Sequence, residues 1–273
     1  MQHHEDTLAA FVAAVQERDE VLGVVVGGSA ARGTERPDSD VDVYLAVEEE
    51  EFARSRALDQ LSYTEHDIAT YAGGYVDVKL ISPHWLATAP AHADQPTRAS
   101  LTGAKVAWSR FPDLQNNLDQ ISSPPDNDWW QRQTESFTAQ FRLYGGYFLP
   151  QGVAHGNVLL THWAAAGFVT AIGRALLADA RVLFAGPKYL RRALQDLPHI
   201  PEPLIVSCEE FLTRPDPAQA IDIMTTTENL LGSALPAERT LGRFIADVEL
   251  AWLWSAPSQA QTNPQRGRAH GNR

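Results

Sequence analysis

Two groups of residues in the first 50 positions have types and a spacing suited to phosphate chemistry. Gly28 and Ser29 follow an apolar run, and Asp40 and Asp42 stand shortly afterwards, at the start of a second apolar run. Side chains alternate along a strand, so the two aspartates share one face, about 6.6 Å apart. A glycine turn offers backbone N–H groups to a polyphosphate, and paired carboxylates hold a hard cation. The combination predicts a magnesium-triphosphate site.

The segment that carries these residues, GGSAARGTERPDSDVDVYL, resembles the signature of the DNA polymerase β-like nucleotidyltransferase superfamily. Arg32-Gly33 and Ser39-Asp40 resemble its small-molecule branch, which includes aminoglycoside and lincosamide nucleotidyltransferases, more than its polymerases. The resemblance covers residues 20–82. It implies a Mg²⁺-dependent enzyme that transfers a nucleotidyl group, AMP when ATP is the donor, to a hydroxyl group and releases pyrophosphate.

The resemblance also implies three carboxylates on neighbouring strands. Asp40 and Asp42 would hold magnesium, and the third carboxylate would share a second metal or accept the proton of the attacking hydroxyl group. Asp77 is the preferred third carboxylate because it stands mid-strand between apolar neighbours, and Asp67 is the alternative. Lys79, on the same strand face as Asp77, is expected to pair with a carboxylate or a phosphate.

Nucleotide binding is assigned to the turn and to basic residues. By the resemblance, Gly28-Ser29 binds the β- and γ-phosphates. Arg32 is expected to steady the triphosphate charge or to pair on the surface with Glu35 or Asp38. In the second half of the chain, Lys188 lies near the start of an expected helix and is either a phosphate ligand or a solvated lysine.

Some residues of the second half are candidates for the acceptor site. The resemblance places this site in the cleft between the two halves. His155 and Glu135 could act as a general base toward an acceptor hydroxyl, although nothing local separates them from surface residues. Trp129, Trp130 and Trp163 are expected in the core rather than as ligand platforms.

Hydrophobic periodicity predicts the elements that must position these residues. Strands are expected at Val21–Val26 and Val41–Val47, preceded by a helix over Thr7–Arg18 and followed by a helix over Glu48–Leu61. A hairpin is expected with arms His66–Tyr71 and Tyr75–Ile81 around Gly73-Gly74. A helix over Pro83–Ala91, an edge strand over Ala104–Trp108 and a helix over Asp113–Leu118 complete the first half.

A Pro- and Ser-rich segment, Ser122 to Asn127, predicts a linker, and helical patterns follow it. They cover Trp129–Tyr144, Asn157–Asp179, Pro187–Leu197, Pro203–Leu212, Pro217–Leu231 and Thr240–Trp254. The predicted fold class is α+β: a nucleotidyltransferase domain with a small mixed sheet flanked by helices over 1–121, and an all-helical substrate domain over 128–255. The tail, 256–273, is expected to be disordered.

Composition limits the partners. Among 273 residues, 22 Lys+Arg against 34 Asp+Glu leave a net charge of −12, which argues against a nucleic-acid partner and favours a cationic acceptor. The sequence predicts neither a membrane span nor a secretory signal. We therefore expect a cytoplasmic location. The single cysteine, Cys208, is expected to be a buried apolar residue rather than part of a disulfide.

Three functions stay open at the level of sequence. The first is transfer of AMP to a small hydroxylated molecule such as an antibiotic. The second is modification of a protein partner, as in an antitoxin-like nucleotidyltransferase. The third is a non-catalytic nucleotide-binding module, against which the intact Asp40, Asp42 and Asp77 argue. The acceptor, the preferred nucleotide and the oligomeric state are left undetermined.

Overall fold

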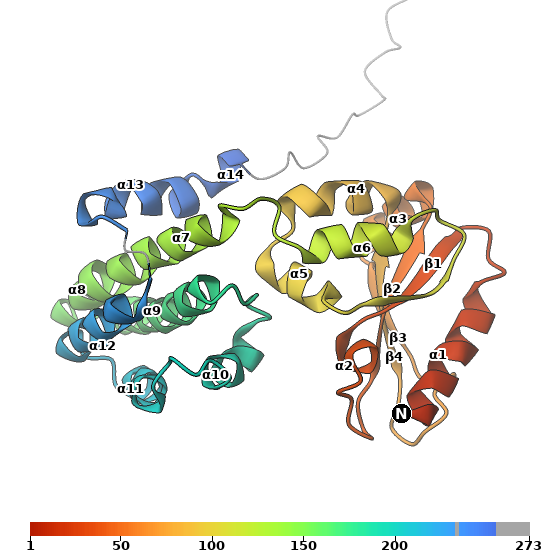
Figure 1. The fold of residues 1–273 in the computed structure, drawn as a ribbon, viewed down its shortest axis with the longest axis horizontal. Coiled ribbons are helices and arrows are strands. Elements are labelled where there is room, and N and C mark those ends of the chain that lie inside the picture. Colours follow the sequence, from red (N-terminus) through yellow and green to blue (C-terminus); the bar gives the residue numbers. More distant parts are fainter. Residues whose placement is uncertain (233–234, 255–273) are drawn as a thin grey trace, which may run out of the picture.

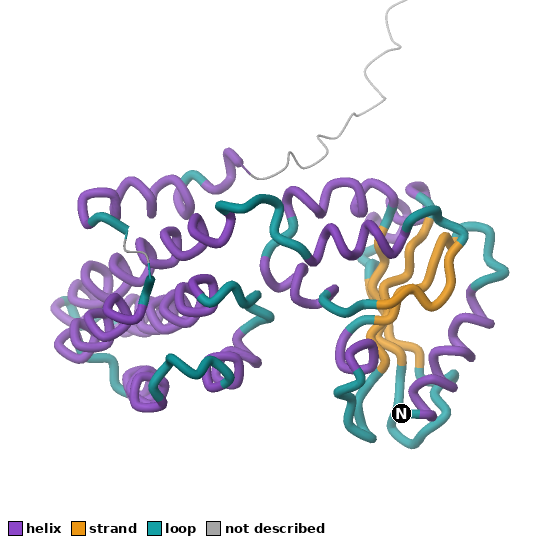
Figure 2. Tube along the Cα trace, in the orientation of Figure 1, coloured by secondary structure: helices purple, strands orange, loops and turns teal. Residues whose placement is uncertain are grey.

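A computed structural model describes residues 1–232 and 235–254, so the tail predicted to be disordered lies outside the described residues. A mixed five-stranded sheet with flanking helices forms the first half, and the second half is helical (Figures 1 and 2), which confirms the expected α+β class. We call residues 1–122 the α/β half and residues 129–254 the helical half. Within the described ranges, no helix is long and apolar enough to span a bilayer.

The sheet has the strand order β3-β4-β2-β1-β5. Its strands are β1 (Val21–Val26), β2 (Val41–Val47), β3 (Ser62–Glu65), β4 (Val76–Ile81) and β5 (Lys105–Ser109). Strands β2 and β4 are parallel, and the other neighbours are antiparallel. The helices of this half are α1 (Gln2–Val15), α2 (Gly28–Arg32), α3 (Glu49–Ala57), α4 (Pro83–His92), α5 (Gln95–Leu101) and α6 (Leu114–Ser122).

Each face of the sheet has its own core. Alternate valines of β2, such as Val41 and Val43, pack with Phe11 of α1 on one face. Residues of the opposite face, such as Ala46, pack against α4, α5 and α6. The alternation places Asp42 on this second face, next to Tyr44, which packs against the same core. The covering helices thus leave one end of the face to polar side chains.

The predicted hairpin is correct in its second arm and wrong in its first. Strand β3 is Ser62–Glu65, paired antiparallel with β4, whereas residues 66–75 form the connecting loop. The four residues of β3 are polar and largely exposed, so this edge strand lacks the apolar alternation that marks buried strands. Ile68, which suggested an extended run, instead packs from the loop onto the core beneath α1.

Other boundaries also differ from the prediction. Helix α1 begins and ends earlier than Thr7–Arg18, and α3 ends at Ala57 instead of Leu61. Helix α5 was not predicted, because two of its three buried side chains, Gln95 and Arg98, are polar, so the helix shows no apolar periodicity. These two residues matter for the joint between the halves.

The helical half packs around α9 (Val158–Asp179), the longest helix described. The other elements are α7 (Trp129–Leu143), η1 (Tyr144–Phe148), α8 (Leu149–Ala154), α10 (Pro187–Gln195), α11 (Glu202–Thr213), α12 (Pro217–Leu230), η2 (Ala237–Arg239), α13 (Thr240–Phe244), η3 (Ile245–Glu249) and α14 (Ala251–Trp254). The single helix predicted over Thr240–Trp254 is therefore divided into three short pieces.

The connection from α6 to α7 is held by the buried side chain of Arg98. Its guanidinium donates hydrogen bonds of 2.7–2.9 Å to four carbonyl oxygens, those of Pro90, Ala93, Ile121 and Ser123. Gln95 adds a direct link between the halves: its amide donates to Gln133 of α7, and its oxygen accepts from the Phe184 N–H. Arg98 thus anchors the start of this linker-like segment at Ser123, and Gln95 ties the α/β half to the helix that follows the segment.

Candidate functional site

Two aspartates lie opposite each other on the neighbouring strands β2 and β4. Asp42 and Asp77 are register partners in the parallel pair, so their backbones are about 4.8 Å apart. Both side chains are partly exposed, while their neighbours Val41, Val43 and Val76 are buried. The structure therefore brings Asp77 to Asp42. It leaves Asp67, the alternative third carboxylate, exposed in the loop after β3.

The glycine turn lies directly against Asp42. The Gly27 N–H donates a 2.9 Å hydrogen bond to the Asp42 carbonyl oxygen. Gly28 has a φ of 60°, and a Cβ atom there would collide with the Asp42 carboxylate. A residue without a side chain is needed on both counts. Ser29 follows in the first turn of α2, so turn and carboxylate form one surface.

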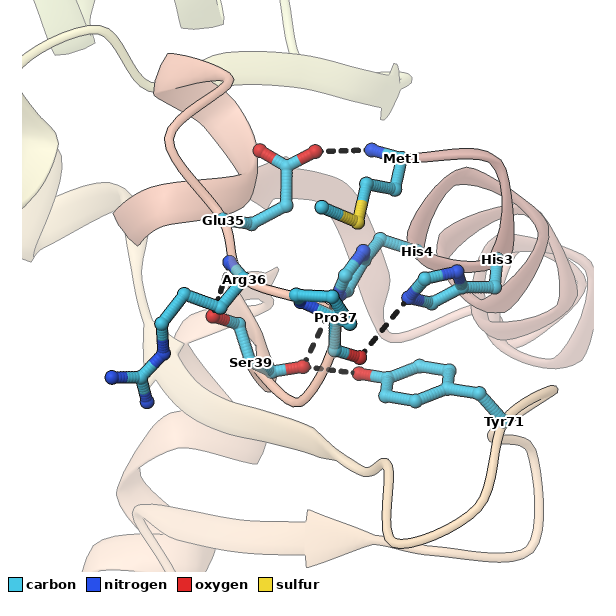
Figure 3. Close-up of polar contacts among 8 residues, drawn as sticks. All are labelled: Met1, His3, His4, Glu35, Arg36, Pro37, Ser39 and Tyr71. Atoms are coloured by element: carbon cyan, nitrogen blue, oxygen red, sulfur yellow. Dashed lines mark hydrogen bonds and ion pairs between the residues drawn. The ribbon is translucent and has the colours of Figure 1, made fainter.

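Asp40 precedes β2, and the loop leading to it is tied down from two sides (Figure 3). The His4 Nε2–H donates to the Ser39 carbonyl oxygen over 3.0 Å, and the Tyr71 hydroxyl donates to the same oxygen. His3 reaches the carbonyl oxygen of Pro37. The network extends to the Met1 ammonium group, which contacts Glu35. Helix α1 and the 66–75 loop thus jointly fix the backbone next to Asp40.

The carboxylates repel one another, and nearby cations only partly offset this. Burial first, and then the charge of Asp40, raise the pKa of Asp42 above its ordinary 3.8, while Lys79 and Arg32 act in the opposite direction. Lys79 forms a 2.6 Å ion pair with Asp77. Burial opposes the charge of Lys79, but the hydrogen bond and charge of Asp77 raise its pKa overall. The cluster would gain from a further cation.

A cleft of about 700 Å³ runs from these carboxylates to the helical half. Its α/β wall includes Gly28, Arg32, Asp42, Tyr44, Lys79 and Ser100, and its helical wall includes Trp130, Arg181, Leu183 and Tyr189. The Tyr44 hydroxyl donates a 2.7 Å hydrogen bond to Ser100, which fixes one side of the cleft. Positively charged side chains of both halves thus line the cleft.

Arg32 faces the cleft and not the surface carboxylates considered from the sequence. Glu35 contacts the Met1 ammonium group, and Asp38 pairs with Arg36. Within the described residues, Arg32 has no carboxylate within ion-pair distance, and its side chain passes over Gly103. It is therefore available to an anion in the cleft.

The structure separates the remaining sequence candidates from the cleft. Lys188 is exposed on α10, with its ammonium group 5.4 Å from the ring centre of Tyr189, and it does not line the cleft, whereas Tyr189 does. His155 is exposed at the end of α8. Glu135 pairs with Arg239 over 3.5 Å. Among the residues that the structure describes, neither His155 nor Glu135 is part of the cleft lining, so the geometry does not support either as a general base there.

Two residues of the cleft were missed at the sequence level. Arg181 stands after the end of α9 with a φ of 57°, a conformation that carries no local sequence signal in an arginine. Trp130 was expected in the core, but it lines the cleft, while its neighbour Trp129 is buried as predicted. Trp163 is half exposed and packs edge-on against Tyr144 and Phe148.

The carboxylates of Asp40, Asp42 and Asp77 are chemically suited to a divalent cation, but their side chains do not yet point to one common position. In the described part of the chain, no three His, Cys, Asp or Glu side chains come together closely enough to hold a metal ion. The fit rests on three carboxylates at one sheet end and on the raised pKa of Asp42. For Asp77 to take part, its ion pair with Lys79 must open.

Comparison with known proteins agrees with this geometry. Residues 8–88, which run from α1 into α4, match the family model described as the nucleotidyltransferase domain. Residues 8–88 of the α/β half are therefore similar to a nucleotidyltransferase domain, in line with the signature, and this similarity supports a transferase activity.

Beyond this domain the similarities are weak. A solved structure, a nucleotidyltransferase-like protein from Exiguobacterium sibiricum, is 13% identical and covers 91% of this chain and 80% of its own, with a TM-score of 0.48. No curated protein matches the chain.

Proposed function

We propose that this protein transfers a nucleotidyl group, AMP from ATP, to a hydroxyl group of a small molecule bound in the cleft, with Mg²⁺ as the required metal. The observation that carries the proposal is the close approach of the Gly28 backbone to Asp42, with Asp77 beside Asp42 on the next strand. This arrangement stands at the mouth of a cleft large enough for a nucleotide or a small acceptor.

Binding of the triphosphate is assigned to the turn and to two arginines. The first N–H groups of a helix have no partners within it, so Gly28 and Ser29 can donate to the β- and γ-phosphates. Arg32 supplies positive charge from the α/β half. Arg181 supplies it from the helical half and replaces Lys188 as the preferred residue, because Arg181 lines the cleft.

Asp40, Asp42 and Asp77 are the residues that would hold Mg²⁺. When bound, the metal would neutralise phosphate charge and orient the α-phosphate for in-line attack. The chain itself contributes the fixed backbone before Asp40 and the register of Asp42 with Asp77. Lys79 lines the same cleft, so its charge would be available to the phosphates once its ion pair with Asp77 opens.

The proposed reaction is a displacement at the α-phosphorus. The acceptor oxygen forms a bond to this phosphorus, the bond to the bridging oxygen breaks, and pyrophosphate leaves with the bonding electrons. Asp77 accepts the proton of the attacking hydroxyl group when it acts as the base rather than as a ligand of a second metal. The products are a nucleotidyl ester and pyrophosphate.

The residues that line the cleft bear on the nature of the acceptor. Charged residues that line it are Arg32, Lys79 and Arg181 against Asp42, so the acidic net charge of the chain is not concentrated there. These cations suit the nucleotide, and they provide no support for a polycationic acceptor. Trp130, Tyr44 and Tyr189 offer aromatic surface, which suits the apolar faces of a hydroxylated ring compound.

Mass spectrometry tests this proposal. A panel of hydroxylated compounds, including aminoglycosides and lincosamides, is incubated with each of the four NTPs and Mg²⁺, and a gain of one nucleotidyl group is sought. Modification of a small molecule supports the proposal. Transfer confined to a protein substrate would indicate an antitoxin-like function instead, and nucleotide binding without any transfer would indicate a binding module.

A further inference from the structure

A second cavity, separate from the cleft, contains an arginine that the proposed reaction does not use. Arg174 lies on α9 with its guanidinium carbon 4.0 Å from the ring centre of Phe137 and 4.9 Å from that of Phe184. Aromatic rings cover the faces of a guanidinium and leave its N–H groups, which point outward in its plane, available. The two rings therefore fix how Arg174 can present its donors.

Arg174 has no polar partner among the described residues. It forms no ion pair or hydrogen bond there, and its Nε is buried without a partner. Its two Nη atoms form no hydrogen bond with the described residues and are not buried, so they are exposed in the cavity that Arg174 lines. Asp94 acts on Arg174 only from a distance, since it caps α5 by accepting the Thr97 N–H over 2.9 Å.

Burying a cation without a counter-ion is unfavourable. Burial lowers the pKa of Arg174 to about 10, which reflects this cost. Arg174 is partly buried, and neither an ion pair nor a hydrogen bond within the described part of the protein offsets its charge. A negatively charged ligand would relieve the penalty.

The cavity has room and polar groups for such a ligand. Its volume is about 810 Å³, and its polar lining, besides Arg174, consists of His92, Gln133, Ser136, Gln140, Arg243 and Asp247. Arg243 is neutralised by Asp247 through a 2.6 Å ion pair. Of the two arginines in this lining, Arg174 is the one whose charge no ion pair among the described residues offsets. The amide and hydroxyl groups are hydrogen-bond donors that an anion could use.

The cavity and the cleft have no lining residue in common. Both border α7, but Trp130 lines the cleft, whereas Gln133 lines the second cavity. Gln133 also accepts the hydrogen bond of Gln95 that joins the halves. The second cavity thus lies beside the joint between the two halves and away from the carboxylates of β2 and β4.

We propose that this second cavity binds a small oxyanion group, phosphoryl or carboxylate, through the Nη atoms of Arg174. Two parallel N–H···O hydrogen bonds to one oxyanion are the preferred geometry of a guanidinium. The rings of Phe137 and Phe184 hold the plane in which those bonds form. This site is independent of nucleotidyl transfer.

Calorimetry without nucleotide or Mg²⁺ tests the site, with inorganic phosphate and acetate as separate probes. We expect saturable binding of at least one probe, and the tighter one identifies the group. Arg174→Met should weaken that binding at least about tenfold, because it removes charge-assisted hydrogen bonds. Arg56→Met, at an exposed position of α3, removes the same charge and should leave the affinity unchanged.

Two further variants make the outcome decisive. Arg32→Gln/Arg181→Gln removes cations from the cleft and should retain binding, which would place the anion in the second cavity. If Arg174→Met does not fold, Arg174→Lys keeps the charge but loses the planar fork, and it should still bind more weakly than the wild type. The proposal is overturned if neither probe binds, or if binding survives in the folded Arg174 variants.

Discussion

Gly28 is held by two independent constraints, its left-handed backbone and its contact with Asp42. Gly28→Ala should lower the free energy of unfolding by about 1–2 kcal/mol from the backbone alone, and further through the collision. Gly33→Ala is the matched control, since Gly33 has a φ of 68° but open space around a Cβ atom. Urea unfolding should show the larger loss of stability in the Gly28 variant. Transfer assays should show loss of activity in that variant only. Equal effects in both variants would remove the contact with Asp42 from the account.

Asp77 is distinguished from Asp67 by position, not by residue type. Asp77→Asn keeps the shape of the side chain in β4, so unfolding should change little, while turnover should fall at least about 100-fold because a metal ligand or proton acceptor is lost. Asp67→Asn, in the exposed loop, should leave turnover unchanged. The assignment fails if the Asp67 variant is the inactive one.

At the scale of elements, α1 and the 66–75 loop fix the approach to Asp40. Tyr71→Phe removes one of two donors to the Ser39 carbonyl oxygen and keeps the ring. We expect a loss of about 1 kcal/mol in unfolding free energy. The Mg²⁺ concentration needed for half-maximal rate should rise, because Asp40 is less well positioned. Tyr147→Phe, an exposed residue of η1, is the control and should change neither quantity. An unchanged Mg²⁺ requirement in the Tyr71 variant would contradict this role.

The elements that sequence predicts well are those with a strong local signal. Strands β1, β2 and β4 have buried valines, and α4 begins at Pro83 after a serine cap. These elements already place Gly28, Asp42 and Asp77 near one another. Strand β3 and helix α5 lack an apolar pattern, because one is an exposed edge and the other buries polar side chains for a tertiary purpose. Arg181 reaches the cleft only through the packing of the halves, and no local pattern reports such packing.

At the scale of the whole molecule, the halves are joined by buried polar groups rather than by a free linker. Arg98 donates to carbonyl oxygens at the C-terminal ends of α4 and α6, where the connection begins, and Gln95 connects α5 to the helical half. Hydrogen bonds of buried charged groups are directional, so they fix an orientation more strongly than apolar contact does. These hydrogen bonds therefore help to orient the two halves that border the cleft.

Cys208 reports on the integrity of the helical half. Burial first, and then the charge of Glu209, raise the pKa of its thiol to about 12. At pH 8 the folded thiol should react with a thiol reagent about three orders of magnitude more slowly than the unfolded chain, whose thiol has an ordinary pKa. The raised pKa also means that stability declines as the pH rises above 9.0, because only the unfolded thiol ionises there. Cys208→Ala should lack this decline. Rapid labelling of protein that circular dichroism shows to be folded would contradict the burial.

The measurement that bears most directly on the central claim is calorimetric titration of the protein with ATP in the presence of Mg²⁺, repeated in EDTA and with Asp42→Asn. Asp42 lies against Gly28 and beside Asp77, so metal and triphosphate should bind as one unit at this point. We expect saturable binding in Mg²⁺ that weakens at least about tenfold in EDTA and in the Asp42 variant. ATP affinity that is the same in all three titrations would contradict a magnesium-triphosphate site built on the turn and these carboxylates.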